Sequence, residues 1–187
     1  MIIAAANVPR ERETLIEIYG EQRRNFLWTL KDISEDDARR VSTVSKLTLG
    51  GLVKHLTNLE RYWIATVLEN DPDATFEMTL DTLDDAYTLL DGESLEFWLG
   101  EYRDQARLTD EFIATVPDLD ALIHIPPAEW ATTRQQQTVR RILFHLFRET
   151  AQHSGHADII REAIDGQNTT HTLRIDGLRT IDHSETI

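Results

Sequence analysis

The stretch that decides the fold is TVRRILFHLFRETAQHSGHADIIREAIDG, residues 138–166. It begins at Thr138, a residue type that caps helix N-termini, and it ends at Gly166, the residue type that most often follows a helix C-terminus. Positions spaced alternately by three and four residues fall on one side of such a helix: Val139, Ile142, Leu146, Glu149, His153, His156, Ile160 and Ala163. The stretch therefore predicts one long amphipathic helix that faces a core.

Three more segments upstream of this stretch show apolar residues at helical spacing, over residues 10–30, 48–69 and 94–116. A short piece opened by Ser34 lies between the first two. Long amphipathic helices usually pack as bundles, and no segment shows the alternation of a strand. We therefore expect an all-α fold in one domain.

The connection between the second and third helical segments, residues 70–93, is unusually long. It contains Pro, Asp, Thr and Gly with little periodicity, apart from one helical turn expected around Leu83–Leu90. A second loop is marked by Pro126 and Pro127.

Composition excludes several classes of function. The 187 residues include 33 acidic and 19 basic ones, for a formal net charge of -14, so the chain as a whole repels nucleic acid. Because there is no cysteine, a disulfide framework, a cysteine-ligated metal and a cysteine nucleophile are excluded. No apolar run is long enough to cross a membrane, and the N-terminus lacks the pattern of a secretory signal. We expect a cytoplasmic protein.

The fourth helical segment carries polar residues at positions that should fill the core. Glu149, His153 and His156 lie within an arc of about 60°, and His145 precedes Glu149 by one helical turn. Side chains of this kind need partners when buried, because an unpaired buried charge is costly.

A divalent metal is one such partner, with zinc the first candidate. Glu149 and His153 are four residues apart and can chelate one ion, and His55 faces inward on the second helical segment among Leu52, Leu56 and Leu59. Two alternatives remain open from the spacing alone. The residues could form a buried hydrogen-bonded cluster in which Arg148 or Arg141 neutralises Glu149, or they could lie on a solvated face.

Two runs of sequence carry a resemblance: HLTNLERYW (residues 55–63) and RETAQHSGHADIIREAIDG (residues 148–166). Together they resemble the DinB-like metal-binding bundles, also called the DinB/YfiT superfamily. The resemblance implies an up-down-down-up four-helix bundle over residues 1–166, with a long crossover between helices two and three and a C-terminal tail over 167–187. It also implies a homodimer and a divalent metal, zinc or nickel, held by His55, Glu149 and His153.

The His-Glu-His ligand set is similar to that of the mycothiol-dependent maleylpyruvate isomerases, although the residues after Gly166 are too few for the second domain of those enzymes. The resemblance implies a transferase or isomerase that activates a mycothiol-like small-molecule thiol on the metal for attack on an electrophilic substrate. His156 and His145 are the candidates for orienting a ligand or moving a proton. A metal-dependent hydrolase and a non-catalytic stress-response or dimerisation module are the alternatives.

Overall fold

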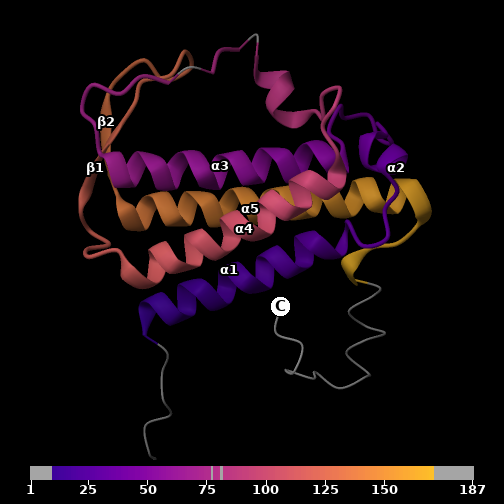
Figure 1. Cartoon of the computed structure of the whole chain (residues 1–187), viewed down its shortest axis with the longest axis horizontal. Coiled ribbons are helices and arrows are strands. Elements are labelled where there is room, and N and C mark those ends of the chain that lie inside the picture. Colours follow the sequence, from indigo (N-terminus) through magenta and orange to yellow (C-terminus); the bar gives the residue numbers. More distant parts are fainter. Residues whose placement is uncertain (1–9, 77, 81, 171–187) are drawn as a thin grey trace, which may run out of the picture.

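The computed structural model describes residues 10–76, 78–80 and 82–170, where four long helices lie side by side (Figure 1). The described helices, one of them short, are α1 (Glu11–Trp28), α2 (Glu35–Arg39), α3 (Leu49–Glu69), α4 (Leu95–Thr115) and α5 (Val139–Asp165). The chain is mostly helical, as the sequence predicts. The tail beyond residue 170, which the sequence assigns outside the helical domain, lies outside the described residues.

The ends of the long helices are set by local signals. The side chains of Thr48, Ser94 and Thr138 each accept a hydrogen bond from the backbone N–H three residues on, at the starts of α3, α4 and α5. At the other ends of α3 and α5, Asn70 and Gly166 adopt left-handed conformations with φ of 42° and 80°. The bounds of α3, α4 and α5 confirm those that the sequence predicts. The prediction succeeds because a helix cap depends on only a few neighbouring residues.

The two connections outside the helices differ in how well the sequence predicts them. The α3–α4 connection contains the expected helical turn as a 3-10 helix, η1 (Leu83–Tyr87), and runs along α3 (Figure 1). The α4–α5 connection, for which the sequence predicts only a loop, contains a short antiparallel hairpin, β1 (Leu122–Ile125) and β2 (Gln135–Thr138), in a chain that is otherwise helical, as an all-α fold class predicts. Strands of four residues, one of them QQQT, are too short and too polar to show an alternating pattern.

The core has two apolar clusters separated by a polar layer. The hairpin-end cluster includes Leu15, Val67, Ile113 and Leu146, and the α2-end cluster includes Phe26, Leu52, Trp98 and Ile160. Between the clusters, the buried positions on all four long helices are polar: Arg23, Thr57, Glu60, Gln105, Thr109, Thr150, His153 and Ser154. This polar layer crosses the molecule at mid-height of the helices, and buried polar groups at such positions need partners.

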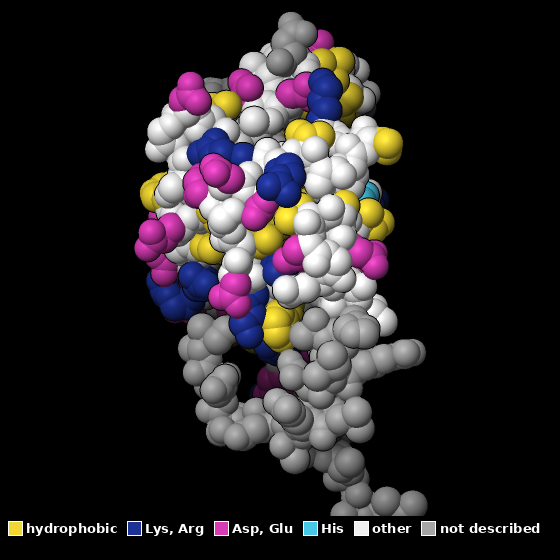
Figure 2. Space-filling view, turned by 90° about the vertical axis from the view of Figure 1, so that its right-hand side faces the viewer, with side chains coloured by type: hydrophobic (Ala, Val, Ile, Leu, Met, Phe, Trp, Pro, Cys, Tyr) yellow, Lys and Arg dark blue, Asp and Glu magenta, His cyan; other side chains and the backbone are white. Residues whose placement is uncertain are grey.

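On the face shown in Figure 2, acidic and basic side chains are interspersed with hydrophobic ones. Within the described residues, no helix combines the length and the apolar character that a membrane span requires.

Candidate metal centre

Helices α3 and α5 bring His55, Glu149 and His153 together. Each residue offers one ligand atom, and these atoms all lie within 4.8 Å of one another. Oε2 of Glu149 is 3.7 Å from Nε2 of His153, and the rings of His55 and His153 are 4.9 Å apart. His153 is buried and the other two are half-buried, which leaves one side of the group toward solvent. The residues that the sequence singles out as ligands thus converge.

The imidazole of His55 has an unused nitrogen. Its Nε2 is buried and has no hydrogen-bond partner among the described residues. Burial, with help from the neighbouring His153, lowers the pKa of His55 to about 3, so the ring is neutral at pH 7. Burial also lowers the pKa of His153. A neutral imidazole with a free nitrogen beside a carboxylate suits a divalent cation such as zinc, so the residues present fit a metal.

The carboxylate of Glu149 is held from its outer side. Nη2 of Arg148 donates to Oε1 of Glu149 at 3.0 Å, and Nδ1 of His145 lies 3.5 Å from the same oxygen. Arg148 therefore neutralises Glu149 in part, as the hydrogen-bonded alternative expects, whereas Oε2 stays directed at His153. Partners of this kind orient the carboxylates that bind metals.

His145, a candidate catalytic residue, lies beside the group rather than in it. Nη2 of Arg148 donates to its Nδ1 at 2.7 Å, so Nδ1 is an acceptor and the neutral ring carries its proton on Nε2. Its ring meets the edge of Trp63, with centroids 5.2 Å apart. Burial lowers the pKa of His145, against the opposing effect of Glu149, which keeps the ring neutral at pH 7.

His156, the other candidate, contacts the opposite side of His153. Its Nδ1 is 3.2 Å from Nδ1 of His153, whereas Nε2 of His153 faces Glu149. If His153 binds a metal through Nε2, its proton sits on Nδ1 and is donated to His156. The position of His156 therefore suits an orienting partner of His153, and it does not belong to the converging group.

Sequence reasoning missed Tyr87, whose ring stacks on His55 with centroids 4.0 Å apart and an interplanar angle of 20°. Tyr87 ends η1, more than thirty residues from His55, and a lone tyrosine in a long connection carries no recognisable pattern. The pair Gly50–Gly51 one turn before His55 is the signal that could have pointed to a close approach of backbone.

The sequence favours connecting loops for His124, His171 and His183, which show no spacing of metal ligands or catalytic partners, but His124 lies in β1. It bonds to Asn70 through its backbone N–H at 2.9 Å, and one ring nitrogen lies 3.0 Å from Nε2 of Gln136. It is remote from the converging group and serves as a structural side chain. The other two, His171 and His183, lie outside the described residues.

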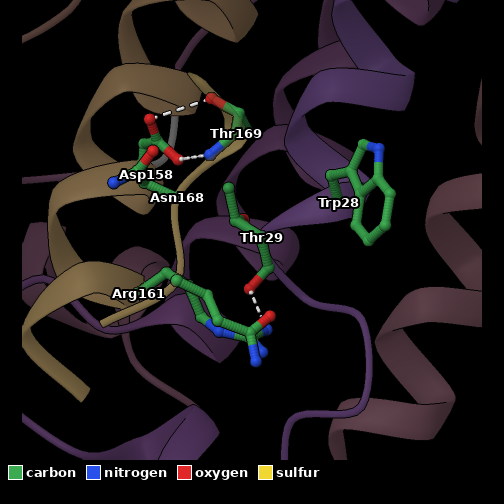
Figure 3. Close-up of a pocket in the computed structure, with 7 residues that line it drawn as sticks. Trp28, Thr29, Asp158, Arg161, Asn168 and Thr169 are labelled. Carbon is green, nitrogen blue, oxygen red and sulfur yellow. Dashed lines mark hydrogen bonds between the residues drawn. The ribbon is translucent and has the colours of Figure 1, made fainter. Parts of the chain in front are cut away.

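Apart from the metal-ligand candidates, a depression lies where the ends of α1 and α5 meet (Figure 3). Its charged side chains are engaged within the chain. Asp158 accepts hydrogen bonds from the backbone and hydroxyl of Thr169, at 2.7 and 2.9 Å, and Arg161 donates to the carbonyl of Thr29 at 3.0 Å. The bonds of Asp158 hold Thr169 against α5, and the bond of Arg161 joins α5 to the end of α1, so we assign them a structural role.

Comparisons with known proteins give a matching family and a solved structure of similar fold. The model of a family described as mycothiol-S-transferase matches residues 14–166. Among solved structures, a conserved protein from Enterococcus faecalis is similar over 86% of this chain and 100% of its own, with a TM-score of 0.62 and 14% sequence identity. At that identity the likeness shows a shared fold alone. The comparison with curated proteins finds no match.

Proposed function

This chain belongs to the mycothiol-S-transferase family, part of the DinB/YfiT-like superfamily, and we propose that it transfers a small-molecule thiol to an electrophilic substrate at a divalent metal. The observation that carries the proposal is the convergence of His55, Glu149 and His153, whose ligand atoms lie within 4.8 Å of one another. The chain has no cysteine, so the reacting sulfur has to come from a cosubstrate. The family description supports mycothiol as that thiol.

The three converging residues would hold the cation, and two imidazoles with one carboxylate favour zinc over nickel as the resident ion. When bound, a divalent cation supplies a Lewis acid that lowers the pKa of a coordinated thiol. Three protein ligands leave a further position for that thiol.

The surrounding residues orient the ligands. We propose that His156 orients His153. Its Nδ1 lies 3.2 Å from Nδ1 of His153 and would accept the proton there when Nε2 of His153 binds the cation. We propose that Arg148 orients Glu149, because it donates a hydrogen bond to Oε1 and leaves Oε2 available to bind the cation. His145 keeps a proton on Nε2, so it can donate a hydrogen bond to a group that becomes negative during the reaction.

The overall reaction is a substitution. A bond forms between the thiol sulfur and an electrophilic carbon, the bond from that carbon to its leaving group breaks, and the leaving group departs with the proton that the thiol has lost. Two neutral imidazoles and a single carboxylate suit the binding of a cation, because burial keeps His55 and His153 from becoming imidazolium ions, which would repel it.

The test combines metal analysis with a transfer assay on protein made without a histidine tag. We expect about one zinc per chain by elemental analysis, and loss of free mycothiol when the electrophile monobromobimane is added, above the uncatalysed rate. His55→Ala and His153→Ala should lose both properties. His124→Ala is the matched control, because it removes a half-buried histidine outside the group, and it should retain both.

Two outcomes would change the proposal. Zinc retained by His55→Ala and His153→Ala would refute this ligand set. Zinc bound by the unmodified protein with no thiol transfer to any electrophile tested would favour the non-catalytic metal-binding module.

The proposal extends to architecture and assembly. An up-down-down-up bundle is supported by Figure 1, where α3 and α4 both begin at the α2 end and α1 and α5 both finish there. We also propose a homodimer, as the resemblance implies, with exposed apolar side chains such as Phe144 and Ile159 on α5, which are 51% and 62% exposed, as candidates for the interface. Sedimentation should then give twice the 21.5 kDa of one chain.

A further inference from the structure

The end of η1 is seated directly on the first turns of α3, and two glycines make this possible. A Cβ added at Gly51 would overlap the carbonyl oxygen of Tyr87, and one added at Gly50 would overlap the side chain of Leu89. The Tyr87 carbonyl is a backbone atom that cannot rotate away. Gly51 therefore permits an approach of two backbones that every other residue type would prevent.

Buried and half-buried cations then fasten this segment. Nζ of Lys54, which is 7% exposed, donates to the carbonyl of Thr88 at 3.0 Å and to Oε2 of Glu93 at 2.9 Å. Nη1 of Arg39 on α2 donates to the carbonyl of Leu89 at 2.8 Å. The backbone that follows Tyr87 is thus fixed to both α2 and α3, and Tyr87 is carried on a rigid support.

This support places the Tyr87 ring over the candidate metal ligands. Gly51 and His55 lie one helical turn apart, so the glycine that admits the Tyr87 backbone stands beside the imidazole that the Tyr87 ring covers. The two rings stack at 4.0 Å, and the Tyr87 ring is 5.9 Å from that of His153. Because Nε2 of His55 makes no hydrogen bond with the described residues, its ring is oriented by packing, with the Tyr87 ring stacked on its face and the His153 ring against it at 4.9 Å.

We propose that Tyr87 is a positioning residue for the metal centre: its ring holds the His55 imidazole in the orientation that converges with Glu149 and His153. This inference rests on the proposed function, since it requires that the three residues bind a metal. The ring rather than the hydroxyl carries the effect, because the face of the ring makes the contact. The α3–α4 connection thereby becomes part of the metal centre, although it supplies no ligand.

The experiment compares three variants of the full chain. Tyr87→Leu removes the ring, Tyr87→Phe keeps the ring without the hydroxyl, and Tyr62→Leu removes another half-buried tyrosine, whose ring packs on Trp63 and Phe76. Zinc dissociation constants are measured by competition with a chromophoric chelator, and the Co²⁺-loaded proteins give visible spectra that report the ligand geometry.

We expect Tyr87→Leu to weaken zinc binding by about 10- to 100-fold, the usual effect of losing a residue that orients a ligand, and to alter the Co²⁺ spectrum. Tyr87→Phe should restore both the affinity and the spectrum, and Tyr62→Leu should leave both unchanged. If Tyr87→Leu folds poorly, Tyr87→Met, which keeps more of the side-chain volume without a ring, should weaken zinc binding in the same direction.

Each result separates this inference from the proposed function. Unmodified protein that binds neither zinc nor Co²⁺ would refute the metal centre itself. Unmodified protein that binds zinc, together with unchanged affinity and spectrum in Tyr87→Leu, would overturn the positioning role alone. Equal losses in Tyr87→Phe and Tyr87→Leu would also overturn it, because the hydroxyl and not the stack would then be responsible.

Discussion

The polar layer has two halves that handle burial in opposite ways. In one half, Arg23 donates to both oxygens of Glu60, at 3.3 and 2.9 Å, and to Asp110 at 2.6 Å. These three charged groups pair with one another, although the buried hydroxyl of Tyr102 beside them has no hydrogen-bond partner among the described residues. In the other half, His55 leaves a buried nitrogen without a partner among the described residues and converges with Glu149 and His153. The charges of the first half are neutralised within the chain, whereas the second half offers a set of ligand atoms that could bind a cation.

The two halves of the polar layer also differ in the protonation of their buried side chains. Burial alone would lower the pKa of Arg23, but Glu60 and Asp110 outweigh burial and raise it, so this half stays charged. Burial lowers the pKa of His55 to about 3, so the other half holds a neutral imidazole. A buried charge that is paired contributes to folding, and a buried imidazole that is neutral and unpaired is ready for a metal. The difference separates a structural ion-pair cluster from a candidate binding site in the same polar layer.

The largest expected effect is on stability, from breaking the paired half. Arg23→Met leaves Glu60, which is 1% exposed, without its partner, and should lower the free energy of unfolding by about 3–5 kcal/mol. Urea denaturation of the metal-free protein measures the loss. Zinc affinity should stay within about threefold of the unmodified protein, because Arg23 contacts none of the three proposed ligands.

The double variant Arg23→Met/Glu60→Met is the control for that prediction. It removes both charges, so it should be more stable than Arg23→Met alone. A double variant less stable than the single one would mean that the pair is not what Arg23 contributes.

The second expected effect is a gain in the free energy of unfolding when zinc binds the half of the polar layer that contains His55. Zinc at about 100 times its dissociation constant should raise the free energy of unfolding by about 2.7 kcal/mol, because it binds the folded chain. Arg23→Met should gain the same increment from its lower starting point, and His55→Ala should gain none. An equal gain in His55→Ala would show that zinc stabilises the protein somewhere else.

The sequence predicts the second half of the polar layer better than the first. Glu149 and His153 interrupt an apolar seam within one helix, so their position is visible from helical spacing. The sequence does not predict the ion pairs of Arg23, because Glu60 lies 37 residues away and Asp110 lies 87 residues away. Contacts at such separations depend on how whole helices pack, and one sequence carries no local sign of them.

The same reasoning explains which parts of the fold were foreseen. The bounds of α5 follow from Thr138 and Gly166, whose effects reach only a few residues. The hairpin depends on pairing between two strands of four residues that each lack a pattern, and the stack of Tyr87 on His55 depends on the path of a long connection. Local signals predicted the helices, and tertiary contacts decided the rest.

The third expected effect is a dependence of stability on pH in the metal-free protein. His55 has a pKa of about 3 when folded and about 6.5 when unfolded, so the unfolded chain binds more protons below pH 6.5. The contribution of His55 is fully present above pH 6.5 and is lost as the pH falls toward 3, at up to about 1.4 kcal/mol per pH unit.

Denaturation in the presence of a chelator, at intervals between pH 7 and 4, measures this dependence. His55→Asn removes the titrating ring and should flatten the curve relative to the unmodified protein. Parallel curves for the two proteins would show that His55 is not held neutral by burial.

The smallest expected effect comes from an ion pair outside the polar layer. Arg107 and Glu111 lie one turn apart on α4 with a separation of 2.7 Å, closely matching the contact of Arg23 with Asp110, but both side chains are 60% exposed. Water already stabilises these charges, and ordering two long side chains costs entropy, so Arg107→Ala should lower the free energy of unfolding by only about 0.3–0.5 kcal/mol. Urea denaturation beside Arg23→Met compares the same residue type at nearly the same distance from a carboxylate. A loss as large as that of Arg23→Met would mean that contact distance, rather than burial, sets the strength of these pairs, and the contrast between the two halves of the polar layer would then lose its physical basis.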